Sequence, residues 1–140
     1  MIPGASSLIP CLSYRDAPAA IEWLCATFGF EKHVTYPDDK GGITHAELRH
    51  GSGMIMLGSV KDSEYGRVIR QPDQADGFVT QSVYVITTQP DELYRRAKAA
   101  GVRMIIDLRE ESYGSRGFTC RDLEGHVWSF GTYDPWATPK

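Results

Sequence analysis

His45 and Glu47 are the side chains of this sequence whose types and spacing best suit acid–base chemistry. They stand two positions apart in the segment 43–50, which its alternating apolar residues predict to be a β-strand, so both point to one face of a sheet. A histidine beside a carboxylate on an inner face can accept and return a proton. A solvated sheet face explains the pattern at least as well, so both interpretations stand as hypotheses.

A second candidate group lies at the entry to a predicted hairpin. Tyr113, Gly114 and Arg116 form a loop before two short strands that meet at the turn 122–125. Arg116 suits an anionic or carbonyl group at the mouth of a cavity, although an Arg in a surface loop would show the same pattern. Bulky and small residues alternate along the last strand, so one face should pack while the other leaves room for a ligand.

Strands and a helix that could position these residues follow from the first half of the chain. A strand over 9–14 precedes a helix over 18–28, which Asp16 would cap and Gly29 would end in a left-handed conformation. Three more strands are predicted over 31–36, 43–50 and 54–57. The first half therefore reads strand, helix, strand, strand, strand.

The same order recurs after a polar connection at 60–78. A strand over 79–87, a helix that begins at Gln89 and Pro90, a strand over 103–108 and the hairpin repeat the first half. Adding 72 takes Leu12 to Tyr84, Pro18 to Pro90 and Gly29 to Gly101, and adding 73 takes 56–59 onto 129–132. We expect one domain, 1–140, made of two modules at about 8–59 and 79–133.

Composition narrows the classes of function. The chain has 140 residues, of which 41% are hydrophobic. Its net charge is -3 and it has no run of Lys or Arg, so the sequence shows no basic patch that would bind nucleic acid or an anionic membrane. No apolar stretch approaches the roughly 20 residues of a spanning helix. Three widely spaced cysteines indicate reduced thiols. We therefore expect a cytoplasmic protein with no nucleic-acid or membrane partner.

Several separated motifs carry a resemblance to a known family: YRDAPAAIEWLCATFGF, HAELRHGSGMIMLG, AKAAGV and YGSRGFTCRDLEGHVWSF. In this order they resemble the glyoxalase / bleomycin resistance / dioxygenase superfamily, also called vicinal oxygen chelate proteins, and look closest to its PhnB-like group. The resemblance implies an α+β fold of two βαβββ modules with mixed concave sheets that enclose a cavity. It also implies a homodimer, because modules of this family commonly complete their cavities across subunits.

Catalytic members of this family hold a divalent metal on the first and last strands of each module. Carried over to this sequence, the ligand positions are Ile9 or Pro10, Met56, Ser82 or Gln81, and Ser129. Ile, Met and Ser do not ligate zinc, nickel, manganese or iron at such sites, and one neutral amide cannot hold a divalent ion. We therefore expect no metal and no other cofactor.

The resemblance further implies that side chains on the faces of the vacated positions line a mostly apolar cavity with a few hydroxyls. The expected ligand-binding residues are Cys11, Ser13, Met54, Met56, Ser82, Tyr84, Tyr113, Arg116 and Ser129. The expected function is metal-free binding of a small organic molecule, such as sequestration of a drug or metabolite. One alternative is a metal-dependent lyase or dioxygenase with relocated ligands, for which His45 and Glu47 are the first candidates. Another is a protein-interaction scaffold with a filled interior, which predicts no cavity.

Overall fold

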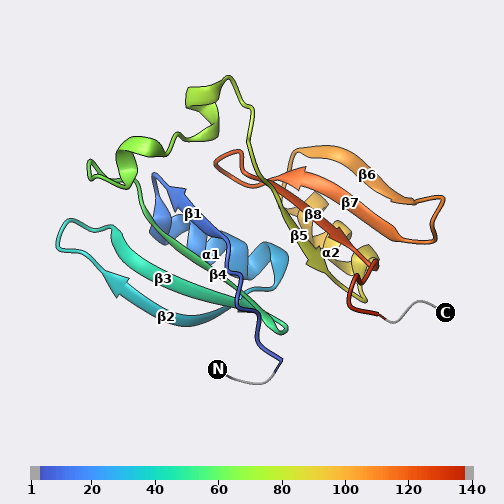
Figure 1. Cartoon of the computed structure of the whole chain (residues 1–140). Helices are drawn as coiled ribbons and strands as arrows, with labels where there is room; N and C mark the ends of the chain where they lie inside the picture. Colours follow the sequence, from blue (N-terminus) through green and yellow to red (C-terminus); the bar gives the residue numbers. More distant parts are fainter. Residues whose placement is uncertain (1–3, 138–140) are drawn as a thin grey trace. The chain divides into compact units, whose positions relative to one another are not determined.

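The computed structural model describes residues 4–137, which divide into two compact units, 4–78 and 79–137. The first unit contains the elements β1 (Cys11–Tyr14), α1 (Ala17–Phe28), β2 (Glu31–Pro37), β3 (Ile43–His50) and β4 (Gly53–Ser59). Its strands form one mixed sheet in the order β1-β4-β3-β2, in which β1 runs parallel to β4 and the other pairs are antiparallel. The predicted order of elements is confirmed for this half (Figure 1).

Helix α1 begins and ends where local chemistry sets its limits. The Asp16 carboxylate accepts a hydrogen bond from the Ala19 backbone N–H at 3.1 Å, which satisfies one donor of the first turn. Gly29 ends the helix at φ 81°, in the left-handed region that glycine adopts without steric cost, and its N–H donates to the Cys25 carbonyl. The helix thus buries one stripe, which includes Leu24 and Phe28.

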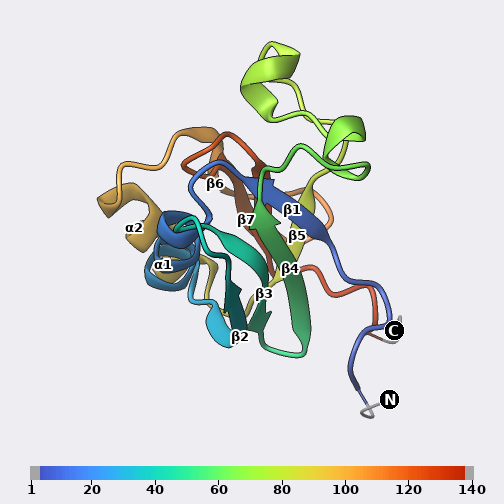
Figure 2. The ribbon, with the colours of Figure 1, turned by 90° about the vertical axis from the view of Figure 1, so that its left-hand side faces the viewer.

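The first sheet packs on α1 with one face only. Tyr14, Ala46, Leu48, Ile55 and Leu57 are buried on the side that α1 covers. Because side chains alternate along a strand, the residues between them lie on the opposite face. In Figures 1 and 2 helix α1 covers a single side of this sheet, so the opposite face is the place for a site within this unit.

The second unit repeats this arrangement with β5 (Val83–Ile86), α2 (Pro90–Ala99), β6 (Met104–Glu110), β7 (Arg116–Arg121) and β8 (Val127–Gly131). The strand order β5-β8-β7-β6, with β5 parallel to β8, matches the first sheet, so the internal repeat is confirmed. Strand β5 is shorter than the predicted 79–87, because 79–82 do not join the ladder and β5 pairs only from Val83 to Ile86.

The register of the repeat differs from the prediction. Cys11 pairs with Met56 in the first sheet and Tyr84 pairs with Ser129 in the second, so both strands are related by 73 positions. The predicted match of Leu12 with Tyr84, at 72, is therefore wrong by one residue. It matched Pro18 with Pro90 and Gly29 with Gly101. Pro18 is exposed and Pro90 buried, however, and the buried counterpart of Pro90 is Ala17 at the first position of α1.

The connection between the units belongs structurally to the first unit. It contains two short 3-10 helices, η1 (Gly66–Val68) and η2 (Pro72–Ala75), and a side-chain capping box closes the start of η2. The Gln71 amide, 2% exposed, donates to the Ser13 carbonyl at 2.9 Å. Arg15 binds both oxygens of Asp73, at 2.5 and 2.7 Å. The segment is thus fastened to β1 and the residue after it (Figure 2).

No helix among residues 4–137 is long and apolar enough to cross a membrane.

Asp122 organises the hairpin turn between β7 and β8. Its carboxylate is 7% exposed and accepts three hydrogen bonds at 3.0 Å, from the backbone N–H groups of Glu124 and His126 and from the Trp128 indole. Gly125 closes the turn at φ 94°. One buried carboxylate therefore satisfies the turn backbone and orients the largest side chain of the second core.

We expect Asp122→Ala to lower the free energy of unfolding by about 2–4 kcal/mol, because three donors, one of them buried, lose their acceptor together. Denaturant unfolding followed by tryptophan fluorescence measures the change. The control Asp39→Ala, at an exposed position, should change it by less than about 0.5 kcal/mol. Equal losses in the two variants would show that the turn does not depend on this carboxylate.

Candidate functional site

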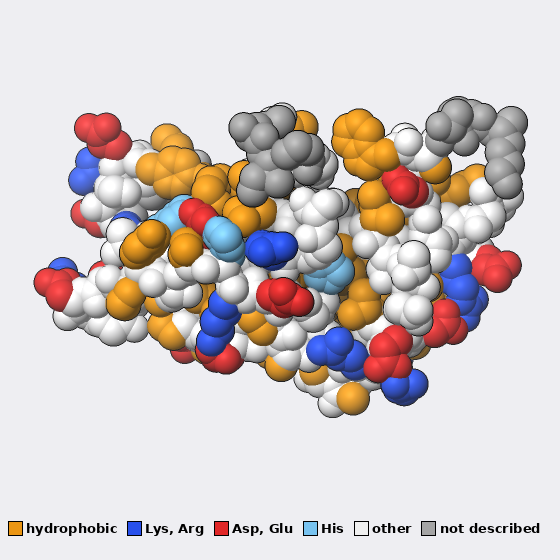
Figure 3. Space-filling model, turned by 90° about the horizontal axis from the view of Figure 1, so that it is seen from below, with side chains coloured by type: hydrophobic (Ala, Val, Ile, Leu, Met, Phe, Trp, Pro, Cys, Tyr) orange, Lys and Arg blue, Asp and Glu red, His pale blue; other side chains and the backbone are white. Residues whose placement is uncertain are grey.

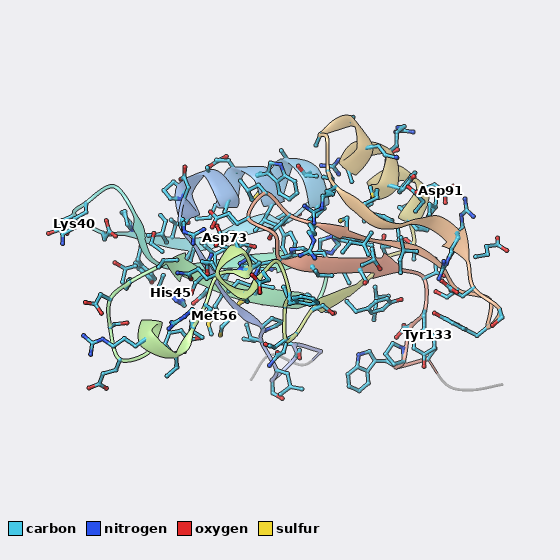
Figure 4. All side chains as sticks on the ribbon, turned by 90° about the horizontal axis from the view of Figure 1, so that it is seen from above. Lys40, His45, Met56, Asp73, Asp91 and Tyr133 are labelled. Atoms are coloured by element: carbon cyan, nitrogen blue, oxygen red, sulfur yellow. The ribbon has the colours of Figure 1, made fainter. Side chains whose placement is uncertain are left out.

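A pocket of about 330 Å³ opens on the face of the first sheet that α1 does not cover. We call its strand side the floor, to which β1 contributes Cys11 and Ser13, β3 His45 and β4 Met56. Cys11 and Met56 are paired across the parallel ladder, so they lie side by side. Figure 4 labels His45 and Met56, which come from neighbouring strands.

The opposite side of the pocket, which we call the roof, comes from the start of the connection. Lys61, Ser63, Tyr65 and Gly66 line the pocket there. The backbone N–H of Val60 donates to the Tyr14 carbonyl at 3.0 Å, so the chain leaves β4 in a fixed direction. The Ser63 hydroxyl accepts from the Gly66 N–H at 3.0 Å, which holds the roof's own turn. The roof is therefore built by local hydrogen bonds.

His45 lines the pocket and contacts the carboxylate of Glu47. Its Nε2 lies 2.8 Å from Glu47 Oε2, and the other carboxylate oxygen lies 3.9 Å from His33 Nε2. The side chains of His45 and Glu47 are 36% and 26% exposed, and the Tyr36 ring stacks on the imidazole with centroids 6.2 Å apart. Figure 3 shows histidines beside an acidic side chain among hydrophobic ones. The predicted shared face of His45 and Glu47 is thus present, and the imidazole Nε2 is within hydrogen-bonding distance of the carboxylate.

The family's metal positions do not fit a divalent ion in this chain. Met56 supplies a thioether to the pocket, and the Ser129 hydroxyl is hydrogen-bonded to that of Thr119 at 2.8 Å. Neither is a donor that zinc, manganese or iron prefers. Throughout the part of the chain that the structure describes, no cluster of three or more His, Cys, Asp or Glu is arranged to hold a metal.

The structure brings together only part of the predicted binding set. Cys11, Ser13 and Met56 line the pocket with His45, whereas Met54, on the same strand face as Met56, is not among the lining residues. Ser82, Tyr84, Tyr113, Arg116 and Ser129 belong to the second unit.

In the second unit the predicted residues already have partners within the chain. The Tyr84 hydroxyl donates to the Tyr133 carbonyl at 2.8 Å, and the Tyr113 ring meets that of Tyr133 edge to face. The Arg116 guanidinium donates to both carboxylate oxygens of Asp91, at 2.9 and 3.0 Å. It therefore forms an ion pair between β7 and the start of α2. Ser82 is exposed and precedes β5. Figure 4 marks Asp91 and Tyr133.

The roof residues were missed by the sequence prediction, which treated 60–78 as a polar connection. A signal existed, because Lys61 follows β4 by two residues and must lie near the end of that strand. Polarity alone did not distinguish a linker from a segment that folds back over its own sheet.

The family model of the glyoxalase/bleomycin resistance protein/dioxygenase superfamily matches residues 9–130. The chain belongs to this superfamily. It is similar to TioX from Micromonospora sp. ML1, with 31% identity, a TM-score of 0.72, and 91% of this chain and 98% of that one covered. It shares its fold with the fosfomycin resistance protein FosX from Listeria monocytogenes, with 17% identity, a TM-score of 0.69, and 96% and 97% covered.

A curated relative is an uncharacterized protein of Mycobacterium bovis, Mb0911c, with 27% identity over 125 residues, which are 89% of this chain and 82% of that protein. These matches cover almost the whole chain. The superfamily and its fold are therefore shown, and the chemistry of this member has to come from its own residues.

The three cysteines differ in their access to solvent. Cys11 is exposed at the pocket, Cys25 is half-buried in α1, and Cys120 is buried in β7. Burial raises the pKa of the Cys25 thiol, and burial with a smaller effect of Asp122 raises the pKa of Cys120 to about 12. The thiolate, the reactive form, is therefore suppressed at Cys25 and Cys120.

We expect iodoacetamide at about pH 8 to alkylate Cys11 first, with Cys25 slower and Cys120 at least tenfold slower than Cys11. Peptide mapping by mass spectrometry after timed quenching measures each rate, and the unfolded protein should label all three at similar rates. Native labelling of Cys120 as fast as that of Cys11 would contradict the burial described here.

Proposed function

We propose that this chain binds a small, partly apolar organic molecule in the pocket of its first unit and does so without a metal. The observation that carries the proposal is the pocket itself, which has a volume of about 330 Å³. Met56 lines it at a position where the family resemblance places a metal ligand. This volume is within the range of small-molecule sites. The role is sequestration of a drug or metabolite, or a binding step.

The chemistry of the lining supports a ligand of mixed character. Met56 and Tyr65 offer apolar surface, and the thioether of Met56 adapts to irregular shapes. Ser13, His45 and Lys61 offer polar groups on different sides of the same space. A few directed polar groups in an apolar pocket orient a ligand while burial supplies affinity.

The proposal also covers the subgroup, the cellular compartment, the oligomeric state and the partners of the protein. We propose a PhnB-like member that acts as a cytoplasmic homodimer, with neither nucleic acid nor membrane as partner. The net charge of -3 supports the absence of an anionic polymer partner. On the face of the second sheet that carries Ser129, Tyr84 and Ile86 are 44% and 39% exposed, which favours a further contact for that face.

We expect Met56→Trp to abolish ligand-induced stabilisation, because the indole would fill the pocket from its floor. The measurement is a thermal-shift screen with a panel of small aromatic compounds, scored on those that raise the Tm of the unchanged protein by roughly 2 °C or more. Met54→Trp is the matched control, since Met54 lies on the same strand and face outside the lining. Retained shifts in Met56→Trp, or equal losses in both variants, would count against this pocket.

The competing proposal is a metal-dependent glyoxalase-like lyase or dioxygenase whose ligands have moved to His45 and Glu47. Their 2.8 Å contact favours it, since an imidazole and a carboxylate are common metal ligands. One FosX structure from Listeria monocytogenes is a complex with Mn(II) and sulfate. In such a reaction the ion would polarise a substrate carbonyl.

Isothermal titration calorimetry at neutral pH distinguishes the two proposals. We expect nickel, zinc and manganese to show no stoichiometric binding in the micromolar range, because no three His, Cys, Asp or Glu side chains of the described residues are arranged to hold a metal. His45→Ala and the control His126→Ala should then behave like the unchanged protein. Micromolar binding with a stoichiometry of one, lost in His45→Ala and kept in His126→Ala, would establish the metal-dependent alternative.

A further inference from the structure

The lining of the pocket has an unbalanced charge. Lys61 lies in the roof, and no Asp or Glu is among the residues that line the space. The other ionisable side chains of the lining are Cys11, His45 and Tyr65, none of which is a carboxylate. Among the described residues that line the pocket, Lys61 therefore supplies the fixed positive charge, and none supplies a fixed negative charge.

Lys61 keeps donors available. Its Nζ donates to the Thr44 carbonyl at 3.3 Å, and an ammonium group has three N–H donors, so two remain. Among the ion pairs of the described residues, none involves Lys61, whereas Arg15, Lys32 and Arg67 of the same unit each contact a carboxylate. The Thr44 carbonyl thus holds the Lys61 ammonium at the pocket. A carbonyl is neutral, and among the described residues no carboxylate in contact with the ammonium neutralises its charge.

Asp38 and Glu47, two acids of the first unit, accept hydrogen bonds from other groups. Asp38 accepts hydrogen bonds from the backbone N–H groups of Lys40 and Gly42, which are the main reason that its pKa is lowered, and Lys61 contributes a smaller electrostatic effect. Glu47 accepts from His45. These carboxylates lie outside the lining and have their own donors, so an incoming anion does not have to displace either of them.

We propose that the pocket selects organic anions, with the Lys61 ammonium binding a carboxylate or a similar acidic group of the ligand. The inference rests on the proposed small-molecule function and specifies its ligand class. The apolar body of the ligand lies against Met56 and Tyr65, and its acidic group lies at the roof beside Lys61. Charge-assisted hydrogen bonds in a partly enclosed site are stronger than those between neutral groups, so the charge discriminates between otherwise identical ligands.

The test uses naphthalene-2-carboxylate and its neutral counterpart naphthalene-2-carboxamide as probes of matched shape. Each is titrated into the full chain labelled with ¹³C at the methionine methyl groups, and the NMR shift of Met56 reports binding in the pocket while Met54 serves as internal reference. The variants are Lys61→Gln, Lys61→Arg and Lys40→Gln, the last removing an exposed lysine outside the pocket.

The carboxylate is expected to bind at least fivefold more tightly than the amide. Lys61→Gln should weaken carboxylate binding about tenfold and amide binding less than twofold, whereas Lys61→Arg and Lys40→Gln should retain the preference. Equal affinity for both probes, or an equal loss of both in Lys61→Gln, would overturn the anion selectivity while leaving the pocket intact. If neither probe shifts Met56, the proposed binding function fails, and this inference fails with it.

Discussion

The parallel pairing of the first and last strand of each unit is the constraint from which the site follows. Cys11 pairs with Met56 in the first sheet, and Tyr84 with Ser129 in the second. Parallel neighbours need a crossover connection, and here a helix is part of it, so one face of each sheet is covered by its own helix. The other face is left for side chains that do not build the core.

In the first unit that face becomes a pocket because the chain folds back over it after β4. Beyond the roof, the connection is held to the start of the chain by two contacts: Gln71 donates to the Ser13 carbonyl, and Arg15 pairs with Asp73. A buried hydrogen bond of this kind contributes on the order of 1 kcal/mol, and an exposed ion pair less. Ligand binding can therefore depend on a segment whose anchors lie some residues further along the chain.

Local chemistry made much of the fold predictable from the sequence. The Asp16 cap, Gly29 and the turn closed by Gly125 are each fixed by neighbours within a few residues, and the structure has all of them. The register of the repeat was harder to predict from the sequence, since Pro18 and Pro90 look equivalent in sequence but differ in burial. His45 and Glu47 were predicted to share a face by strand periodicity, and they do. Lys61 was not predicted, because the polar composition of 60–78 was interpreted as a linker, although its position two residues after β4 places it near the end of that strand.

The most direct test of this account is a crystal structure of the full chain, purified without chelator and grown with naphthalene-2-carboxylate. The account predicts density for the naphthalene ring against Met56 beneath the roof of residues 61–66, with the carboxylate within hydrogen-bonding distance of Lys61 Nζ. A cation coordinated by His45 and Glu47, or a ligand bound only away from the first sheet, would contradict it.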